Sequence, residues 1–529
     1  MLVKEKFIYL FLIFSLELYE VRAQNAGVKV AISKSEEHEL EGGSGFSSSS
    51  TDLLGFGADS FSNYYVLKSV PIKGSKYNSL AMDIYNSNLK LQKTKNLDLP
   101  SEKNSVLNLE DLYQIKNKPI VFYSQFDNTS DNRTLYYQQL DESLQKSKVE
   151  KLLNFNTPNK EKGGFETFFS TDSSKIMVVV YEPQKQQENF RIKCFVYQSN
   201  MTKLKDYSID FGVENRDVKD YNIGVSNKGY PLIFMTSVRD EKNPDYGKWK
   251  EELLVFVETN SPLKFNLDMK EKAISFLRKT YESGDDLSFV GTIQNAKKDD
   301  AGTLGTCFIK INLKEKKASQ TSINYFNSEV LSFFKLDEKD IKAGRGVDYF
   351  VPLFTGRTAN NSSVIVLGSY YTERTNGAIT GYYELSKIAV TYQENGQQKY
   401  QKVIPNSVYA DKHIGRINHV FIYGNNVCVM YNTSAKNLEP EYRAKVKTQN
   451  RVMPLINNTY TIAPIGKSKG LICLTHVDEN GKLSNIPLTS YKEDRMILAP
   501  SRVYCDGNNF VFAVVGKAGF RVIKGVFSK

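Results

Sequence analysis

The sequence predicts an all-β protein folded as a single β-propeller of four-stranded blades. Three observations support this prediction. A two-stranded phrase recurs along the chain, two further short strand candidates precede most of its copies, and no long amphipathic helix interrupts the series. One small sheet cannot bury both of its faces alone, so repeated units of this kind stack around an axis and bury each sheet against its neighbours.

The repeated phrase is clearest at two places. Residues 84–99 (IYNSNLKLQKTKNLDL) and residues 196–211 (VYQSNMTKLKDYSIDF) align without a gap. In each, an alternating run ends at a turn composition of Ser and Asn, and a second extended run follows. This arrangement is typical of a β-hairpin. We interpret the phrase as the outer hairpin of a blade.

The number of copies sets the predicted number of blades. Looser copies of the phrase begin at Leu135, Leu254, Phe308, Ile388 and Leu474. Seven copies, spaced by about 55 to 60 residues early and about 85 late, predict seven blades, with six or eight as alternatives. Two stacked β-sandwich domains and two smaller propellers are the rival architectures. The even early spacing and the lack of a linker after residue 60 argue against both.

The two ends of the chain are predicted to meet. The C-terminal runs MILAPSRVY, NFVFAVV and FRVIKGVF form a blade that is one strand short. A strand near Tyr64–Ile72 is expected to complete this blade and close the ring. The preceding Gly/Ser-rich stretch GGSGFSSSSTDLLGFG is typical of a flexible segment, so residues 24–60 are predicted to be mostly flexible and residues 61–529 to form the propeller.

The N-terminus has the pattern of a secretory signal peptide. Lys4 and Lys6 precede the apolar run Phe7–Leu16, and small residues at Val21 and Ala23 suit cleavage. We therefore expect residues 1–23 to be removed and the protein to be exported, either to the periplasm or outside the cell. An uncleaved interfacial segment is the alternative. No later stretch approaches the roughly 18 apolar residues needed to span a bilayer, so the mature chain is expected to have no transmembrane segment.

Composition restricts the partners of the chain. Among its 529 residues, 70 Lys and Arg face 59 Asp and Glu, which gives a net charge of +11 spread along the sequence. No block of basic residues resembles a nucleic-acid-binding arm, so no nucleic-acid partner is predicted, whereas an acidic polysaccharide is compatible with this charge.

The cysteines are predicted to be structural. Cys194, Cys307, Cys428, Cys473 and Cys505 are an odd number without short spacings, which fits neither a disulfide framework nor a zinc site. Four of them lie in apolar runs, so buried free thiols are predicted. One pair among the last three is the alternative.

The C-terminal third contains the series GRGVDYFVPLF, GSYYTERTNG, YELSKIAVTYQENGQQKYQKVIPN, FIYGNNVCVMYNTSAKN and GLICLTHVDENGKLS. Over roughly residues 345–529, this series resembles a family of exported bacterial proteins of uncharacterised function. The family has Ile-Pro-Lys and Tyr-Asn-Asp elements, where this chain has Ile404-Pro405-Asn406 and Tyr431-Asn432-Thr433. The resemblance implies a Gram-negative envelope setting and a propeller-like fold, and it implies no activity.

The sequence contains no catalytic signature that we can identify. The Gly-x-Ser-x-Gly elbow is absent, and a single Trp excludes the repeated Trp-ended turns of sialidase-like propellers. The densest polar cluster combines Asp411, His413, Arg416 and His419. Its spacing fits no standard metal site, so we interpret it as a polar loop between blades with a strand histidine, rather than as a metal or acid–base site.

A second polar loop is also interpreted as a structural feature rather than as a metal site. The loop DNTSDNRT, which begins at Asp127, offers oxygen ligands for calcium but lacks the spacing and closing Glu of an EF-hand, so a solvated turn is predicted. No cofactor and no metal are predicted.

Long insertions are expected to share one face of the ring. The predicted strands place Val238–Lys250, Gln294–Gly302, Thr372–Gly381 and Thr433–Gly466 between the second and third strands of their blades. Long loops on a rigid scaffold are where recognition residues concentrate. The candidate binding residues on these insertions are aromatic or basic, and Tyr, Trp and Arg are common interface hot spots: Tyr246, Trp249, Arg374, Tyr442, Arg443, Lys445, Lys447 and Arg451. The alternative is that the insertions are merely tolerated surface excursions.

These features favour a non-enzymatic role. The expected function is an exported propeller that acts as an interaction or scaffolding subunit in the cell envelope, with a protein partner that belongs, by analogy with other periplasmic propellers, to an outer-membrane complex. The alternative is a polysaccharide-binding or carbohydrate-active propeller, since many tyrosines suit sugar stacking. The scarcity of Trp weakens this alternative.

Overall fold

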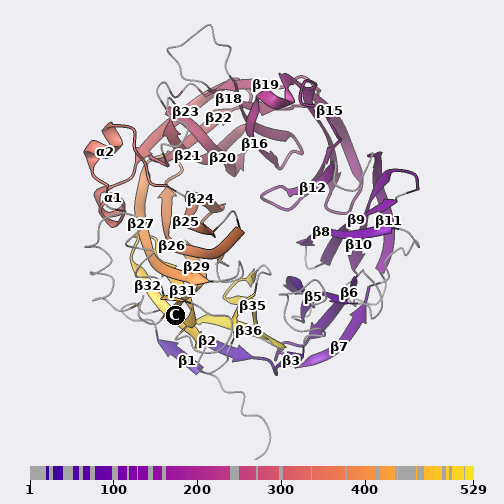
Figure 1. The fold of residues 1–529 in the computed structure, drawn as a ribbon, viewed down its shortest axis with the longest axis vertical. Helices are drawn as coiled ribbons and strands as arrows, with labels where there is room; N and C mark the ends of the chain where they lie inside the picture. The colour runs from indigo at the N-terminus through magenta and orange to yellow at the C-terminus, as the bar shows by residue number, and fades with distance from the viewer. Residues whose placement is uncertain are drawn as a thin grey trace, which may run out of the picture.

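A computed structural model gives the fold of the chain. It describes residues 19–22, 28–39, 52–58, 63–71, 78–97, 105–115, 118–127, 129–140, 147–157, 163–238, 249–267, 269, 272–296, 302–334, 336–348, 350–375, 378–410, 418–434, 438, 460–461, 470–490, 496–499, 503–516 and 519–528. These residues form eight β-sheets arranged as a ring (Figure 1). We number the sheets as blades 1 to 8 along the chain and name the strands of a blade a to d outward from the axis.

Blades 1 to 4 follow one another without interruption. Blade 1 contains β4 (Asp52–Ala58), β5 (Tyr64–Pro71), β6 (Asn78–Tyr85) and β7 (Leu91–Asn96). Blade 2 contains β8 (Ser105–Ile115), β9 (Lys118–Asp127), β10 (Asn132–Leu140) and β11 (Ser147–Asn156). Blade 3 contains β12 (Gly164–Phe169), β13 (Lys175–Tyr181), β14 (Asn189–Gln198) and β15 (Lys203–Glu214). Blade 4 contains β16 (Val218–Val225), β17 (Pro231–Val238), β18 (Trp249–Val255) and β19 (Leu263–Asn266).

Blades 5 to 7 repeat the pattern with additions. Blade 5 contains β20 (Lys272–Ser283), β21 (Asp286–Asn295), β22 (Gly305–Asn312) and β23 (Lys317–Tyr325). Blade 6 contains β24 (Phe350–Arg357), β25 (Ser363–Thr375), β26 (Ala378–Tyr392) and β27 (Gln398–Ala410), and the short β30 (Tyr460–Thr461) pairs with β27. Blade 7 contains β28 (Asn418–Tyr423), β29 (Asn426–Ser434), β31 (Gly470–Val477) and β32 (Leu483–Ser490).

Blade 8 joins both ends of the chain. It contains β33 (Ile497–Leu498), β34 (Tyr504–Asp506), β35 (Asn509–Val515) and β36 (Gly519–Ser528), together with β1 (Tyr19–Arg22), β2 (Lys29–Lys34) and β3 (His38–Glu39). The described helices are short: η1 (Asn215–Asp217) precedes β16, and α1 (Ser328–Phe333) and α2 (Glu338–Lys342) lie between blades 5 and 6.

The ring has eight blades, so the leading prediction of seven is wrong and the alternative of eight is correct. All seven copies of the repeated phrase are c–d hairpins, from β6–β7 to β31–β32. Blade 8 has no such hairpin, because the strand outside β36 is β2 from the N-terminal region. Counting hairpins therefore missed one blade. In the innermost layer, β34 contacts β4, which brings blade 8 against blade 1.

The strand that was expected to complete the last blade lies elsewhere. Tyr64–Pro71 is strand b of blade 1 and pairs with β4 and β6. Residues 24–60, predicted to be mostly flexible, contain β2, β3 and β4 in their described parts. Glycines at positions 55 and 57 hid β4 from a composition-based prediction, since such residues are depleted in strands. Strand β1 falls within the predicted signal peptide.

The repeated phrase recurs because its turn has a fixed geometry. Leu89 and Met201 occupy the same place in the c–d turns of blades 1 and 3, and both have left-handed backbone angles, with φ of 61° and 65°. Gly396 and Gly481 fill this place in the Glu-Asn-Gly turns of blades 6 and 7. Glycine adopts this conformation without steric cost, which explains the Asn-Gly composition of the later copies.

The core lies between neighbouring blades. Strand β13 reads KIMVVVY and strand β17 reads PLIFMTSV, and nearly every residue in them is buried. Both faces of these b strands are covered by the adjacent blades, so their sequences are continuously apolar rather than alternating. Outermost strands such as β23 (KASQTSINY) are largely exposed and polar.

The cysteines follow the leading prediction. All five are free, and the four in apolar runs are buried, whereas Cys505 is exposed. Within the described part of the chain, no helix is long and apolar enough to cross a membrane.

Candidate functional site

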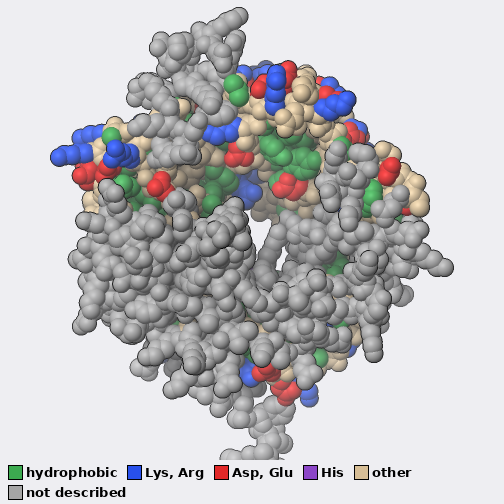
Figure 2. Space-filling view, in the orientation of Figure 1, with side chains coloured by type: hydrophobic (Ala, Val, Ile, Leu, Met, Phe, Trp, Pro, Cys, Tyr) green, Lys and Arg blue, Asp and Glu red, His purple; other side chains and the backbone are tan. Residues whose placement is uncertain are grey.

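The described residues enclose a cavity of about 450 Å³. Its lining comes mainly from β12, β16 and β20, the innermost strands of three consecutive blades, and it includes Thr355 of β24. These strands face the middle of the ring (Figure 1). Figure 2 shows the ring hollowed at its middle, with basic, acidic and hydrophobic side chains of described residues near the rim of the hollow. A cavity of this volume falls in the range of small-molecule binding sites.

The cavity has an apolar floor and a polar rim. Leu232, Phe234, Leu277 and Phe289 on the floor belong to the core packed between blades 4 and 5. The charged side chains in the lining are Glu166, Arg278 and Lys279, and they form the rim. Most of the lining residues precede the a–b turns of their blades, so the cavity lies toward the turn face of the ring, opposite the b–c connections.

Glu166 is an exposed carboxylate held by a tyrosine. Tyr181 on the neighbouring strand β13 donates its hydroxyl hydrogen to Glu166 Oε2 at 2.6 Å. Burial raises the pKa of Tyr181, and the hydrogen bond to Glu166 raises it further. Tyr181 therefore stays a protonated donor at neutral pH. The fixed carboxylate can accept a hydrogen bond from a hydroxyl group in the cavity.

Arg278 supplies a cation to the rim. Its side chain is exposed, and its guanidinium lies 5.8 Å from the ring centre of Phe276 on the same strand. Among the residues that the structure describes, Arg278 forms no ion pair and no hydrogen bond through its side chain. Asn222 of β16 accepts the backbone N–H of Leu277 at 3.1 Å and thereby fixes β20, which carries Arg278, against blade 4.

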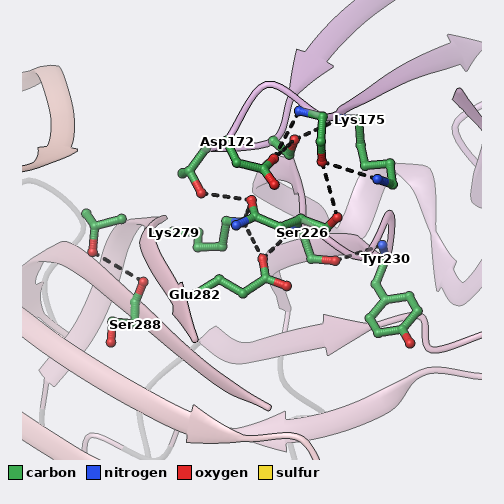
Figure 3. Close-up of polar contacts among 12 residues, drawn as sticks. Asp172, Lys175, Ser226, Tyr230, Lys279, Glu282 and Ser288 are labelled. Carbon is green, nitrogen blue, oxygen red and sulfur yellow. Dashed lines mark hydrogen bonds and ion pairs between the residues drawn. The ribbon is translucent and has the colours of Figure 1, made fainter. Parts of the chain in front are cut away.

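A buried ion pair lies where the cavity approaches the a–b turns (Figure 3). Lys279 Nζ is 2.7 Å from Glu282 Oε2, and the two side chains are 6% and 3% exposed. The backbone N–H of Asn227, in the a–b turn of blade 4, donates to the same carboxylate oxygen. Burial lowers the pKa of Lys279, while the charge of Glu282 acts in the opposite direction. Both charged residues lie on β20 and have no net charge together, and their hydrogen bonds with Asn227 join blade 5 to blade 4.

The a–b turns share a hydroxyl-capped design. Ser170, Ser226 and Thr358 stand at the start of these turns in blades 3, 4 and 6, and each hydroxyl oxygen accepts a backbone N–H from the end of its turn at 2.9 to 3.1 Å. In blade 3, Asp172 also accepts the Ser170 hydroxyl at 2.6 Å. Such local bonds are typical of Ser and Asp in turns, so this part of the network is structural.

The predicted binding face is composed of b–c connections. The four predicted insertions connect strand b to strand c, at β17–β18, β21–β22, β25–β26 and β29–β31. Tyr246, Tyr442, Arg443, Lys445, Lys447 and Arg451 lie outside the described residues. Trp249 begins β18 opposite Val238, and Arg374 lies on β25 opposite Ile379. These two residues therefore lie in different blades, Trp249 in blade 4 and Arg374 in blade 6.

One insertion is a regular sheet rather than a loop. Strands β25, β26 and β27 have 13, 15 and 13 residues and run past the body of blade 6 on the b–c side. We call residues 370–375, 378–384 and 408–410 the blade-6 extension. In its register Tyr371 pairs with Tyr383, and Tyr383 pairs with Tyr409. Three tyrosines therefore stand opposite one another across three strands.

Of the four residues in the predicted polar cluster, the structure describes only His419. Asp411, His413 and Arg416 lie outside the described residues, and His419 lies on β28. The His419 Nε2 atom is 3.1 Å from the carbonyl oxygen of Ala499. Burial lowers the pKa of His419 to about 4, so the ring is neutral at pH 7. His419 is thus a neutral strand histidine bonded to backbone, and the rest of the cluster stays a prediction.

In the loop that was considered for calcium, the carboxylate of Asp127 forms hydrogen bonds with residues of the same loop. Asp127 accepts the backbone N–H and hydroxyl of Thr129 at 2.9 and 2.7 Å and the hydroxyl of Ser130 at 2.5 Å. These hydrogen bonds lower the pKa of Asp127 to about 2. This carboxylate closes a turn, as predicted for a solvated loop.

Sequence analysis missed Glu166 and Arg278. They lie far apart in the chain, on strands of blades 3 and 5, and no short motif marks either residue. The available signal was a charged residue inside an otherwise apolar innermost strand, as in GFETFF and AISFLRKTY. Such strands line the middle of a propeller, so charges on them face its axis.

Comparisons with known proteins give no family. No family model matches the chain, and no curated protein matches it. Among solved structures, it is similar to the β-propeller domain of the Trilobed protease from Pyrococcus furiosus, at 7% identity over 72% of this chain and 89% of that chain, with a TM-score of 0.35.

Two further solved structures show the range of these similarities. Polysaccharide lyase Uly1 is 10% identical over 86% of this chain and 93% of its own, with a TM-score of 0.40. Prolyl oligopeptidase B from Galerina marginata is 9% identical over 88% of this chain and 55% of its own, with a TM-score of 0.41. With TM-scores below 0.5, none of these similarities supports an inference about function.

Proposed function

We propose that the protein is an exported, non-enzymatic propeller that binds a protein partner in the cell envelope through its b–c face. The observation that carries this proposal is the blade-6 extension. Among the described residues it is the longest regular element on that face, and its register places Tyr371, Tyr383 and Tyr409 opposite one another across three strands. Tyrosine is enriched at protein interfaces because it offers a large contact area with few rotatable bonds.

The other b–c connections support the same face. Blades 4, 5 and 7 also have long connections there, whereas most of the described a–b and c–d turns are tight. The scaffold beneath is a closed sequence of packed sheets, so loops on one face can change without disturbing the core. Export is supported by the N-terminal pattern of Lys4, Lys6 and the apolar run Phe7–Leu16.

The test is affinity capture of a partner with matched variants. Full-length protein, expressed in its own host, is captured from gently solubilised envelope, and a stoichiometric partner is expected. The triple variant Tyr371→Ser, Tyr383→Ser and Tyr409→Ser is expected to lose this partner. A control triple in exposed c–d turns, Lys316→Ser, Glu394→Ser and Lys482→Ser, is expected to keep it.

Two further variants examine the rest of the face. Trp249→Ala and a shortened connection within residues 439–459 leave β29, β30 and β31 in place. Each is expected to weaken partner binding while the variant stays folded. If the wild type captures no stoichiometric partner, or if every b–c variant binds it as the wild type does, the proposal is wrong.

A further inference from the structure

We propose that the cavity between blades 3 and 5 binds a singly charged, hydroxylated carboxylate of the size of a sugar, such as a uronic acid residue. This site lies toward the turn face, opposite the b–c connections, so the proposal is independent of the protein-partner role. It rests on the cavity, on the charges that line it and on the kinds of polar group that its rim offers.

The charges on the rim select a monoanion. Lys279 is neutralised by Glu282 at 2.7 Å, which leaves Arg278 as the cation and Glu166 as the carboxylate of the described lining. A neutral ligand leaves the Arg278 guanidinium without a counter-ion. A dianion such as a phosphate ester places a second negative charge near Glu166 with no further cation to balance it. One carboxylate matches one guanidinium, and the two planar groups can form two parallel hydrogen bonds.

The remaining rim groups suit hydroxyls. Glu166 keeps one oxygen for a ligand while its other oxygen accepts the Tyr181 hydroxyl. Thr355 of β24 also lines the cavity and carries a hydroxyl, which can donate or accept a hydrogen bond. The floor of Leu277 and Phe289 is apolar and suits the C–H face of a sugar ring. A sugar with a carboxylate therefore has a group for each part of the cavity: the carboxylate for Arg278, hydroxyls for the polar rim and a C–H face for the apolar floor.

The structure also offers a way to fill the cavity without changing its charges. Gly224 lies in the lining, and a Cβ atom placed there would meet no atom within 4 Å. Gly224→Leu is thus expected to project into the cavity without a backbone clash. Arg278→Gln removes the cation instead. Lys203→Gln removes one exposed positive charge on the outermost strand of blade 3 and serves as the charge-matched control.

The test measures binding of sugar pairs by calorimetry or ligand-observed NMR on the full-length mature protein. D-glucuronate and D-glucose differ at C6, where one has a carboxylate and the other a hydroxymethyl group. Glucuronate is expected to bind saturably and at least about tenfold more tightly than glucose. Arg278→Gln and Gly224→Leu are each expected to weaken glucuronate binding by about tenfold or more, and Lys203→Gln by less than about twofold.

Every other result overturns the proposal. Equal binding of glucose and glucuronate, or no saturable glucuronate binding, excludes the ligand class. If glucose 6-phosphate or glucose 6-sulfate binds more tightly than glucuronate, the cavity prefers an anion other than a carboxylate. If Gly224→Leu keeps the unfolding temperature of the wild type and still binds glucuronate equally well, the sugar binds outside this cavity. This result decides the question even if Arg278→Gln fails to fold.

Discussion

Lys279 and Glu282 form an ion pair of 2.7 Å in which both side chains are almost fully buried. Removing one partner of such a pair leaves an uncompensated charge in a site of low polarity. We therefore expect Lys279→Met to lower the free energy of unfolding by about 3–5 kcal/mol, as measured by urea denaturation. The double variant with Glu282→Gln is expected to recover at least half of this loss, because the stranded charge is gone.

An exposed pair provides the control. Lys203 and Asp206 lie 3.1 Å apart with side chains 49% and 60% exposed, so Lys203→Met is expected to change stability by less than about 1 kcal/mol. A loss at Lys279 no larger than the loss at Lys203 would show that the buried pair does not hold blades 4 and 5 together.

His419 should make stability depend on pH. Burial lowers its pKa to about 4 from the ordinary value of 6.5, so between these two values the unfolded chain binds more protons than the folded one. The free energy of unfolding should therefore rise with pH through this window, by at most about 1.4 kcal/mol per pH unit for one histidine. Below about pH 4 the full penalty is present, and above about pH 6.5 it has disappeared.

The comparison with His419→Gln isolates this contribution. Burial also lowers the pKa of His38 and of His476, so the wild type alone reports their sum. The variant should show a shallower slope between pH 4 and 6.5. Parallel curves for the two proteins would contradict the assignment.

Strand β2 should stabilise blade 8. Ile32 is 1% exposed and packs in the core shared by blades 7 and 8. Ile32→Ala is expected to cost about 2–5 kcal/mol of unfolding free energy, whereas Ser33→Ala on the same strand should change it by less than about 0.5 kcal/mol. Equal, small effects of both variants in chemical denaturation would mean that the pairing of β2 with β36 does not contribute to the fold.

Two strand glycines should respond differently to the same substitution. A Cβ atom on Gly291 of β21 would lie 2.2 Å from the carbonyl oxygen of Phe276, whereas one on Gly224 of β16 would meet nothing within 4 Å. Gly291→Ala is expected to destabilise the protein by about 1–3 kcal/mol, and Gly224→Ala to leave it unchanged or slightly more stable. Thermal unfolding of both variants checks this difference, and a reversed order would contradict the packing.

The repeated architecture could be predicted because its turns have local sequence requirements. A left-handed residue at the positions of Leu89 and Gly481 accompanies Asn, Asp and Gly, and these residues are visible in the sequence. Blade 8 could not be counted in this way, because β2 joins β36 across nearly the whole chain. Such pairing depends on long-range packing, which no local pattern reports.

The candidate site was less accessible to sequence reasoning. The b–c positions of the long insertions were predicted from strand order, and strand pairing confirms them at all four places. The row of Tyr371, Tyr383 and Tyr409 depends on a register across three strands, with shifts at two β-bulges in the first pairing. Glu166 and Arg278 line the same cavity only because the ring brings blades 3 and 5 to it.

The most direct test of the proposed recognition face is site-specific photo-cross-linking. A benzoylphenylalanine is placed at Tyr383 in the blade-6 extension or at Lys316 in a c–d turn on the opposite face, and each protein is irradiated in the native envelope. We predict a cross-linked band containing the captured partner from position 383 and none from position 316. The same partner cross-linked from position 316, with none from position 383, would contradict the assignment of the b–c face.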